Sequence, residues 1–385
     1  MNIMVKLANL KGLASLGGAD SIGTGIAGIF WFFLATLIEP EEFGEIQYYL
    51  SIAGVALFIS MIGAQNTITV YVAKNIKLLS TLYVLTIILS IASAIILFLI
   101  FYRLDVSVII FGYVIGELCI AYLLGKKFFT KYAWYVITQK SLTLILGLIF
   151  FYLFGVEGVI FGLALSYIHY VKIFFNGLKN SSLNFKLFRS RIEFIGNNYM
   201  HSLVHGVRGR IGHILIAPLL GFALLGEFSL ALQILAVLMM FSGIAFKYLL
   251  PQDATGAKNY KLKKIVIVLA VIITILGITV LPLILPTVFP KYVGVVDAIQ
   301  IMSLGIIPVT LNMIFISQLL GNEKSRSVLI GESITFTTII FGIVFLGPIM
   351  EIKGLAISYV LAYSFQTIYL IFVKYFQKTK NTLNR

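Results

Sequence analysis

Residues 123–167, LLGKKFFTKYAWYVITQKSLTLILGLIFFYLFGVEGVIFGLALSY, contain the pattern that decides the fold of this chain. Two apolar runs begin within this stretch, over residues 135–154 and 156–176, and Lys126 and Lys127 precede the first run. Each run has about 20 residues, the length that an α-helix needs to cross roughly 30 Å of hydrocarbon. The stretch therefore predicts two successive membrane-spanning helices joined by a very short turn.

The same pattern returns later in the chain. Residues 319–363, LLGNEKSRSVLIGESITFTTIIFGIVFLGPIMEIKGLAISYVLAY, resemble residues 123–167 at an offset of 196 residues. At this offset Gly125 matches Gly321 and Gly158 matches Gly354. The similarity indicates an internal repeat, with chance similarity between two apolar sequences as the alternative.

A second pair of stretches supports the repeat. IEPEEFGEIQYYLSIAGVALFISMIGA (38–64) is similar to FALLGEFSLALQILAVLMMFSGIA (222–245), and the Gly-Glu pairs that begin at Gly44 and Gly226 are 182 residues apart. A tandem copy of a six-span unit keeps its orientation because six is even. We therefore expect two parallel repeats around a central cavity, an architecture that suits alternating access.

The composition agrees with a membrane protein. Of the 385 residues 60% are hydrophobic and 11% are charged, and the mean hydropathy is +1.02, far from the balance of a soluble domain. We predict an all-α polytopic membrane protein with about 12 transmembrane helices. The expected spans are 12–38, 44–64, 78–101, 106–124, 135–154, 156–176, 194–219, 224–248, 263–287, 295–319, 328–347 and 353–374.

These spans divide into two lobes of six helices. We expect an N-terminal lobe over residues 1–180, a cytoplasmic linker over 181–192 and a C-terminal lobe over 193–385. The connections between spans are short, so no soluble domain of any size is expected.

The loop charges set the predicted orientation. Basic residues dominate alternate loops and the C-terminal tail, and acidic residues are more frequent in the other loops. The basic set is Lys74, Lys77, Lys126, Lys127, Lys131, Lys179, Lys186, Arg189, Arg191, Lys258, Lys261, Lys263, Lys264, Lys324, Arg326, Lys378, Lys380 and Arg385. By the positive-inside rule this side is cytoplasmic. We therefore expect a multi-pass protein of the cell membrane with both termini in the cytoplasm.

Several other classes of protein are disfavoured. The net charge of +14 is spread over short loops, so we expect no nucleic-acid partner. The single cysteine, Cys119, excludes an internal disulfide and a cysteine-based metal cluster. The sequence has no P-loop and no HExxH or GxSxG motif, so we expect neither an enzyme nor a cofactor or metal site.

Three motifs carry a resemblance to a known family. They are LATLIEPEEFGEIQYYLSIAGV (34–55), LPLILPTVFPKYVGVVDAIQIMSLGIIP (281–308) and IKGLAISYVLAYSF (352–365). In this order and spacing the chain resembles the polysaccharide transporter family, the Wzx-type O-antigen flippases. That family belongs to the multidrug/oligosaccharidyl-lipid/polysaccharide exporter superfamily, and the resemblance covers nearly the whole chain.

The resemblance implies a flippase. Such a protein moves an isoprenyl-pyrophosphate-linked oligosaccharide from the cytoplasmic to the outer leaflet of the membrane and uses an ion gradient of H+ or Na+. Two alternatives stay open. One is a drug or cation antiporter of the same superfamily, and the other is a membrane-embedded glycosyltransferase or polymerase that uses the same lipid donors.

The seventh predicted span contains an unusual set of cations. Between Arg191 and Pro218 we expect one helix, with Arg208 near the middle of the membrane. An arginine there costs about 2.5–3.5 kcal/mol on insertion scales, so it should face water or a partner. Helical spacing places four residues in one polar stripe, which are Asn198, His201, His205 and Arg208.

This stripe is the candidate substrate site. Arginine suits phosphate through its bidentate fork, and histidines beside it add donors that can respond to pH. Arg210 lies about 200° away from Arg208 on the helix, so it should pair with an acid such as Glu117 or reach past Gly209. The alternative is a hydrogen-bond network that only holds helices together.

Two embedded acids are candidates for ion coupling. Asp20 lies in the first span with Thr24 one turn later, and Glu117 lies in the fourth span. An acid within a span is a functional candidate by default, with a structural partner for an arginine as the alternative. Lys140, near the cytoplasmic end of the fifth span, is expected to extend its amine towards the membrane surface.

Overall fold

The computed structural model describes residues 2–179, 183–255, 259–322 and 324–383, and every regular element in these ranges is a helix. The first half contains α1 (Asn2–Leu37), α2 (Pro40–Met61), α3 (Ala64–Ala73), α4 (Leu79–Phe101), α5 (Leu104–Gly125), α6 (Phe129–Leu165), η1 (Ile168–Tyr170), α7 (Val171–Lys179), α8 (Phe185–Ser190) and α9 (Ile192–Arg208). The second half contains α10 (Ile211–Leu220), α11 (Phe222–Leu238), α12 (Met240–Ala254), α13 (Tyr260–Thr279), α14 (Leu281–Val288), α15 (Gly294–Ser303), α16 (Ile306–Gly321), α17 (Ser325–Phe345) and α18 (Gly347–Leu383).

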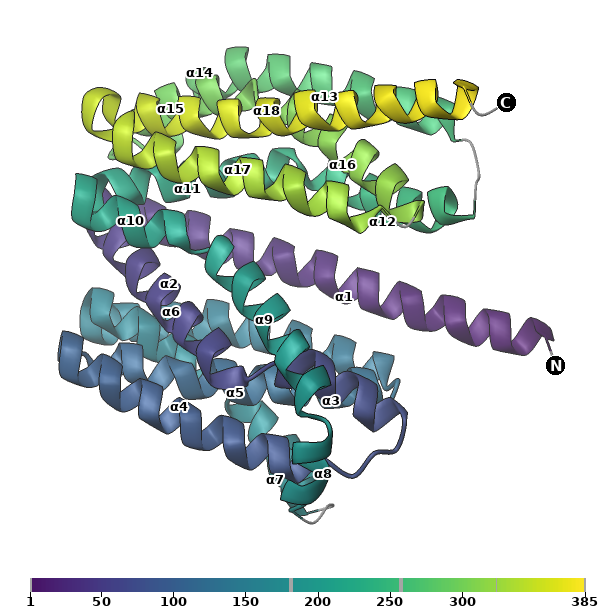
Figure 1. Ribbon diagram of the computed structural model, residues 1–385. Coiled ribbons are helices and arrows are strands. Elements are labelled where there is room, and N and C mark those ends of the chain that lie inside the picture. Colours follow the sequence, from purple (N-terminus) through teal and green to yellow (C-terminus); the bar gives the residue numbers. More distant parts are fainter. Residues whose placement is uncertain (1, 180–182, 256–258, 323, 384–385) are drawn as a thin grey trace. The chain divides into compact units, whose positions relative to one another are not determined.

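The chain divides into two compact units (Figure 1). Unit 1 comprises Met1–Ile38 and Ile46–Ile214, and unit 2 comprises Glu39–Glu45 and Leu215–Arg385. The boundary near residue 214 falls later in the chain than the expected linker at 181–192. The first turn of α2 belongs to unit 2, although the rest of α2 belongs to unit 1.

The predicted repeat is visible as two matching helical hairpins. The backbone reverses at Gly155 within α6 (φ 70°, ψ −154°) and at Glu351 within α18 (φ 49°, ψ −128°), and these two positions are 196 residues apart. In the first hairpin Gly158 lies against the carbonyl of Phe150, and in the second Gly354 lies against the carbonyl of Leu346. The same offset of 196 residues therefore relates both the turns and their closest packing contacts.

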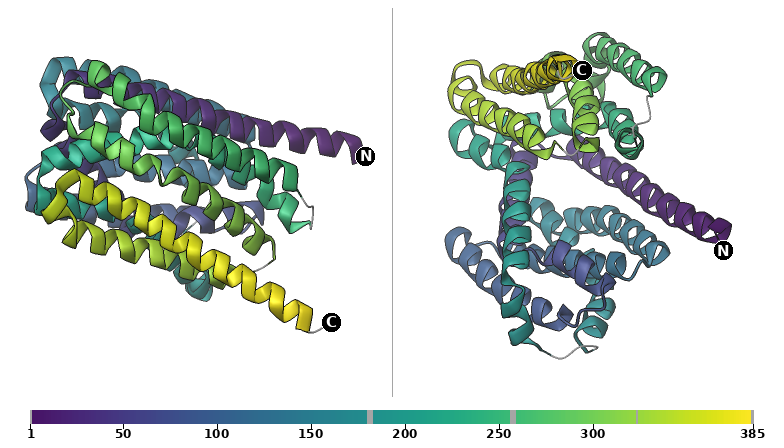
Figure 2. Two further views of the ribbon diagram at one scale, coloured as in Figure 1. Left: turned by 90° about the horizontal axis from the view of Figure 1, so that it is seen from above. Right: turned by 45° about the vertical axis from the view of Figure 1, so that its right-hand side comes forward.

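The second hairpin can be followed in two views. Figures 1 and 2 show α17 and α18 side by side. In the first hairpin the two arms are joined at Ser166, whose hydroxyl accepts from the Gln139 side-chain amide at 3.0 Å and is hydrogen-bonded to the Thr143 hydroxyl at 3.1 Å. Such buried polar contacts satisfy side chains that have no water available.

The helices account for most of the expected spans, but among the described residues the seventh, 194–219, is not one of the segments that are long and apolar enough to cross a membrane. Among the described residues eight helical segments are long and apolar enough to cross a membrane, and two bent pairs raise this number to ten. The bent pairs are α11 with α12, at 51°, and α15 with α16, at 44°. The 50-residue segment Phe129–Leu178 contains the reversal at Gly155, so it covers two of the expected spans.

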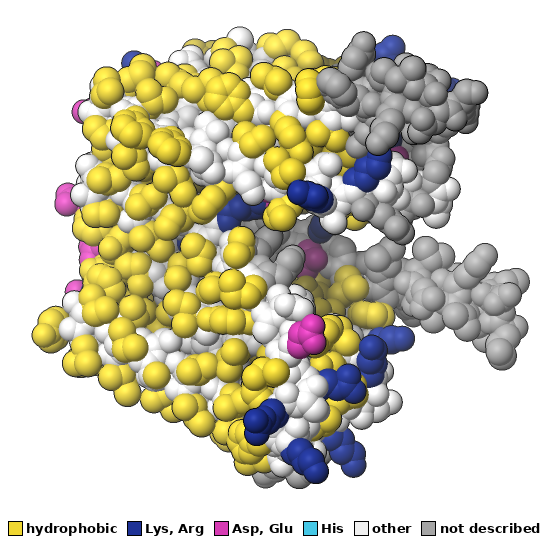
Figure 3. Space-filling view, viewed as in Figure 1, with side chains coloured by type: hydrophobic (Ala, Val, Ile, Leu, Met, Phe, Trp, Pro, Cys, Tyr) yellow, Lys and Arg dark blue, Asp and Glu magenta, His cyan; other side chains and the backbone are white. Residues whose placement is uncertain are grey.

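The surface of each unit fits a lipid environment. Apolar side chains cover most of the visible face of both units (Figure 3). Many large ones are exposed in the long helices, for example Leu99 at 61% and Phe345 at 59%. Exposed apolar side chains of this density are expected where lipid, and not water, surrounds a helix. The chain is therefore a multi-pass membrane protein.

Candidate functional site

The seventh span is broken where the cations lie. Helix α9 ends at Arg208, residues Gly209 and Arg210 form a turn, and α10 starts at Ile211. The Arg210 amide donates to the Val207 carbonyl at 3.0 Å, so the chain tightens by one residue before α10 begins. The expectation of one continuous helix to Pro218 was therefore wrong, because glycine at 209 readily leaves the helical conformation.

The four residues of the predicted stripe all lie on α9. Arg208 is half-buried at its last position. The side-chain amide of Asn198 donates to the Phe194 carbonyl of its own helix at 2.9 Å, so part of its hydrogen-bonding capacity is used locally. The side chains of His201 and His205 lie outside the described residues. Their common face follows from helical spacing alone.

Arg210 turns into the interior of unit 1. Its guanidinium lies over the ring of Phe58, with 5.7 Å between Cζ and the ring centroid, which is within the range of a cation–π contact. A Cβ atom on Gly54 would occupy the space of this guanidinium. Arg210 Nε is buried and has no hydrogen-bond partner among the described residues. Glycine at position 54 thus creates the space in which Arg210 lies.

Glycines also bring α9 close to α2. Gly206 of α9 lies against the ring of Phe58, and Gly63, which has φ 68°, lies against the backbone of α9 at Tyr199. A side chain at either glycine would separate the two helices. This close packing places the start of α3 and the residue Ser202 beside the same small cavity.

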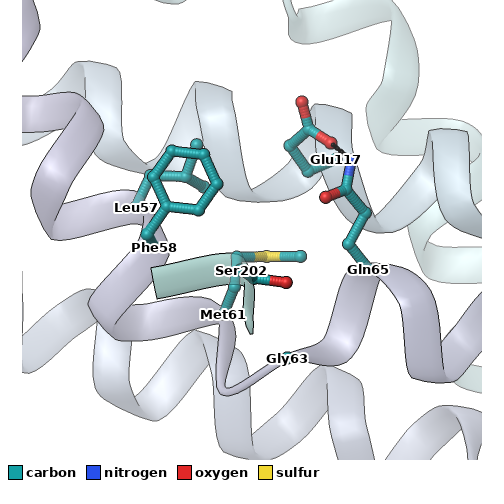
Figure 4. A pocket seen from close by; sticks show the side chains of 7 residues that line it. All are labelled: Leu57, Phe58, Met61, Gly63, Gln65, Glu117 and Ser202. Atoms are coloured by element: carbon teal, nitrogen blue, oxygen red, sulfur yellow. Dashed lines mark hydrogen bonds between the residues drawn. The ribbon is translucent and has the colours of Figure 1, made fainter. Parts of the chain in front are cut away.

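Glu117 lies at that cavity. The cavity has a volume of about 40 Å³, and Figure 4 shows its lining residues, which are Leu57, Phe58, Met61, Gly63, Gln65, Glu117 and Ser202. The Gln65 amide Nε2 donates to Glu117 Oε2 at 2.5 Å (Figure 4). A space of this size, with a carboxylate, an amide and a hydroxyl on its walls, suits one water molecule or a small cation.

Two cations act on the Glu117 carboxylate. The charges of Lys140 and Arg210 both interact with it electrostatically. Lys140 is half-buried, and its side chain passes beside Gly23 of α1. A Cβ atom added to Gly23 would be only 3.2 Å from Lys140 Cγ. Lys140, which was expected to extend its amine towards the membrane surface, thus also interacts with an embedded acid. Glu117 thus lies in the electrostatic field of two cations.

Asp20 is held by a tyrosine from α6. Tyr132 Oη donates to Asp20 Oδ1 at 2.8 Å. Thr24, one turn later on the same face of α1, donates its hydroxyl to the backbone carbonyl of Asp20 at 2.7 Å. Tyr132 also interacts electrostatically with Glu117. Within unit 1, α1, α3, α5, α6 and the turn after α9 therefore contribute to one polar track.

Sequence reasoning missed the partners of this track. Tyr132 and Lys140 resemble residues of the membrane surface, and nothing in their spacing indicates a contact with an acid. Gln65 gave a usable signal, because Gln-Asn-Thr at 65–67 interrupts an apolar run and a short helix, α3, begins at this place. Among the described residues no group of three or more His, Cys, Asp or Glu could hold a metal ion.

Comparison with known proteins gives a match in structure and not in sequence. No protein-family model matches the sequence, and no curated protein matches it. Lipid II flippase MurJ in the inward closed conformation matches with a TM-score of 0.73 at 14% identity, over 92% of this chain and 86% of that chain. An inward-facing multidrug resistance MATE family transporter of the MOP superfamily matches with a TM-score of 0.68 at 14% identity, over 93% and 94% of the two chains.

An outward-facing conformation of a MATE family transporter also matches, with a TM-score of 0.61 at 13% identity, over 96% of both chains. These similar structures are transporters and not enzymes. The chain therefore has the twelve-helix fold that MurJ and the MATE transporters share.

Proposed function

We propose that this protein is a flippase that moves an isoprenyl-pyrophosphate-linked oligosaccharide from the cytoplasmic to the outer leaflet by alternating access. The observation that carries the proposal is the turn between α9 and α10, where Arg208 and Arg210 lie close together within the seventh expected span. A charged side chain in this position is costly unless it faces water, a partner or an anionic ligand. Similarity in fold to the lipid II flippase supports the proposal.

The face of α9 would receive the pyrophosphate. Arg208 would bind it through the bidentate fork of its guanidinium, and His201, His205 and Asn198 would add donors along the same face. Arg210 would contribute positive charge from the interior of unit 1, where its Nε has a donor to offer. Both termini would lie in the cytoplasm, because the basic loops are on that side.

Ion coupling would use the polar track of unit 1. Glu117 would be the carboxylate that exchanges H+ or Na+, because it lines a cavity and interacts electrostatically with two cations. When it is ionised, Glu117 would attract Arg210, and when it is protonated this attraction would weaken. Asp20 would act on the same track through Tyr132. An ion at Glu117 could thereby alter the arginine that faces the substrate.

A second candidate function is a drug or cation antiporter. The observation in its favour is the pair of acids, Asp20 and Glu117, which lie on one track in a fold that the multidrug resistance MATE transporters share. The two functions demand ligands of opposite charge. An antiporter for cations would bind a lipophilic cation at the acids, and a flippase would bind an anionic lipid at the arginines.

A binding experiment separates these functions. Purified protein would be titrated with an isoprenyl pyrophosphate and, separately, with the lipophilic cation tetraphenylphosphonium. We expect the pyrophosphate to bind and Arg208→Ala to weaken its binding at least about tenfold, the loss of one charge-assisted contact. Arg326→Ala, which removes an exposed arginine from the start of α17, is the matched control. Binding of the cation without the pyrophosphate would favour the antiporter, and full export activity of an Arg208→Ala, His205→Ala variant would exclude the assigned site.

A further inference from the structure

One end of unit 1 has a strongly basic surface. It is formed by the loop between α3 and α4 and by the segment that contains α8. Five exposed cations lie on these two segments, namely Lys74, Lys77, Lys186, Arg189 and Arg191. Residues 74–78 and 183–192 contain no acidic residue. In Figure 3 Lys and Arg side chains gather over this part of unit 1. We call these five residues the basic platform.

A hydrogen bond and a ring contact fix the segment that contains α8 to the two helices, α3 and α4, on either side of the loop. The backbone amide of Asn184 donates to Thr81 Oγ1 at the start of α4 at 2.8 Å. The side-chain oxygen Asn184 Oδ1 caps α8 by accepting from the backbone amide of Leu187 at 2.8 Å. Near the other end of the segment the rings of Phe194 and Tyr71 stack with 5.3 Å between their centroids. The basic platform is therefore a docked surface whose cations are held on one side of unit 1.

Apolar side chains are exposed beside these cations. Leu183 and Phe185 are 54% exposed and Ile192 is 59% exposed. Helix α8 has six residues, so it is far too short to span a membrane. Exposed apolar side chains next to Lys and Arg on such a short element are the pattern of a segment that lies in the membrane interface. A surface that contacts only water or nucleic acid is not expected to expose these three large apolar side chains together.

We propose that the basic platform binds the headgroups of anionic phospholipids, with Leu183, Phe185 and Ile192 inserted among the upper acyl chains. The guanidinium groups of Arg189 and Arg191 bind the lipid phosphates as bidentate donors. Lys74, Lys77 and Lys186 add attraction to a negative leaflet. This segment follows α7 and precedes α9, so the bound lipid holds the connection to the arginine-bearing helix at headgroup level. The proposal does not depend on the transported substrate.

The test counts lipids on the purified protein. Native mass spectrometry would compare phosphatidylglycerol with phosphatidylcholine of the same chain length, for the wild type and for Lys186→Gln, Arg189→Gln, Arg191→Gln. We expect the triple variant to lose affinity for phosphatidylglycerol at least about tenfold while its weak binding of phosphatidylcholine is unchanged. The matched control is Lys261→Gln, Lys264→Gln, Arg326→Gln, which removes three exposed cations from unit 2 and should change little.

Two further variants separate charge from packing. Arg189→Lys, Arg191→Lys keeps the charge and should retain most of the phosphatidylglycerol binding. Phe185→Ser keeps every cation and should weaken that binding several-fold. Equal losses in the unit 2 control and in the platform variant would overturn the proposal, as would wild-type binding in the platform variant. Displacement of the lipid by inorganic pyrophosphate at equal phosphate concentration would reassign the platform to a free phosphate ligand.

Discussion

The backbones of Gly44 and Gly226 lie directly against each other within unit 2. A Cβ atom on Gly44 would overlap the carbonyl oxygen of Phe222, and a Cβ atom on Gly226 would overlap that of Pro40. These two glycines begin the Gly-Glu pairs through which the repeat was recognised in the sequence. Residues that are equivalent in the two halves thus meet each other in space.

The contact between these glycines predicts a strong effect of a single methyl group. Gly44→Ala or Gly226→Ala should each destabilise the protein by about 1–3 kcal/mol, because the displaced partner is backbone and cannot rotate away. Thermal unfolding in detergent would measure the effect. Gly25→Ala is the control, because no atom lies within 4 Å of a Cβ at that position. Equal melting temperatures for all three variants would contradict the close contact.

The space that holds Arg210 predicts that Gly54, far from Arg210 in the sequence, affects substrate binding. Gly54→Ala should displace the Arg210 guanidinium and reduce binding of an isoprenyl pyrophosphate about tenfold, as Arg210→Ala should. Arg210→Lys should recover part of the binding, because lysine keeps the charge but loses the bidentate fork. The double variant Gly54→Ala, Arg210→Ala should bind the isoprenyl pyrophosphate no more weakly than Arg210→Ala alone. Additive losses would show that Gly54 acts through something other than Arg210.

The Glu117 cavity predicts which acid couples transport to an ion. Glu117→Gln keeps the size of the side chain but removes the charge that Lys140 and Arg210 share. Transport by this variant should no longer depend on external pH or Na+, and substrate should still bind. Glu157→Gln, at an exposed position, should behave like the wild type. Transport assays in vesicles with an imposed gradient would measure this, and retained ion dependence in Glu117→Gln would remove Glu117 from the coupling path.

The orientation in the membrane can be read with single cysteines in a Cys119→Ser background. Glu41→Cys and Glu351→Cys should react with an impermeant thiol reagent added outside intact cells, whereas Lys127→Cys and Ser325→Cys should not. All four positions are exposed, so accessibility within the protein does not limit the reaction. Permeabilised cells provide the control for the two internal positions. Reaction of residue 127 in intact cells would invert the predicted topology.

The two bent spans of unit 2 are joined just beyond their bends. The hydroxyls of Ser242 in α12 and Thr310 in α16 are hydrogen-bonded at 2.8 Å, and both are buried. A double-mutant cycle with Ser242→Ala and Thr310→Val should give a coupling free energy of about 0.5–1.5 kcal/mol in thermal or chemical unfolding. The cycle with Ser242→Ala and Thr279→Val, where Thr279 bonds only to the carbonyl of Ile275 in its own helix, should give none.

The repeat and the spans could be predicted because they depend on patterns that are local or that recur. Long apolar runs and the offsets of 182 and 196 residues contain this information directly. The break after Arg208 could not be predicted with the same certainty, because a glycine within a membrane helix is common and only packing decides whether it bends the chain.

The partners within the polar track show a second limit. The pairing of Gln65 with Glu117 joins α3 to α5, and that of Tyr132 with Asp20 joins α6 to α1. Such pairs depend on how helices far apart in the sequence pack against each other. Helical spacing gives the face of a residue on its own helix but does not give the helix that it meets. The arginines and acids were therefore found as candidates, and their neighbours were not.

The two hairpin turns have similar backbone conformations but different residues at the corner. At Gly155 the backbone takes a conformation that glycine adopts freely, but at Glu351 a side chain tolerates nearly the same angles. A non-glycine residue in this region costs on the order of 1–3 kcal/mol, so the surrounding helices must impose the corner. The packing of the hairpin, and not the residue type at its corner, therefore sets this turn in both repeats. Between the two repeats the backbone turn is therefore better preserved than the residue that forms it.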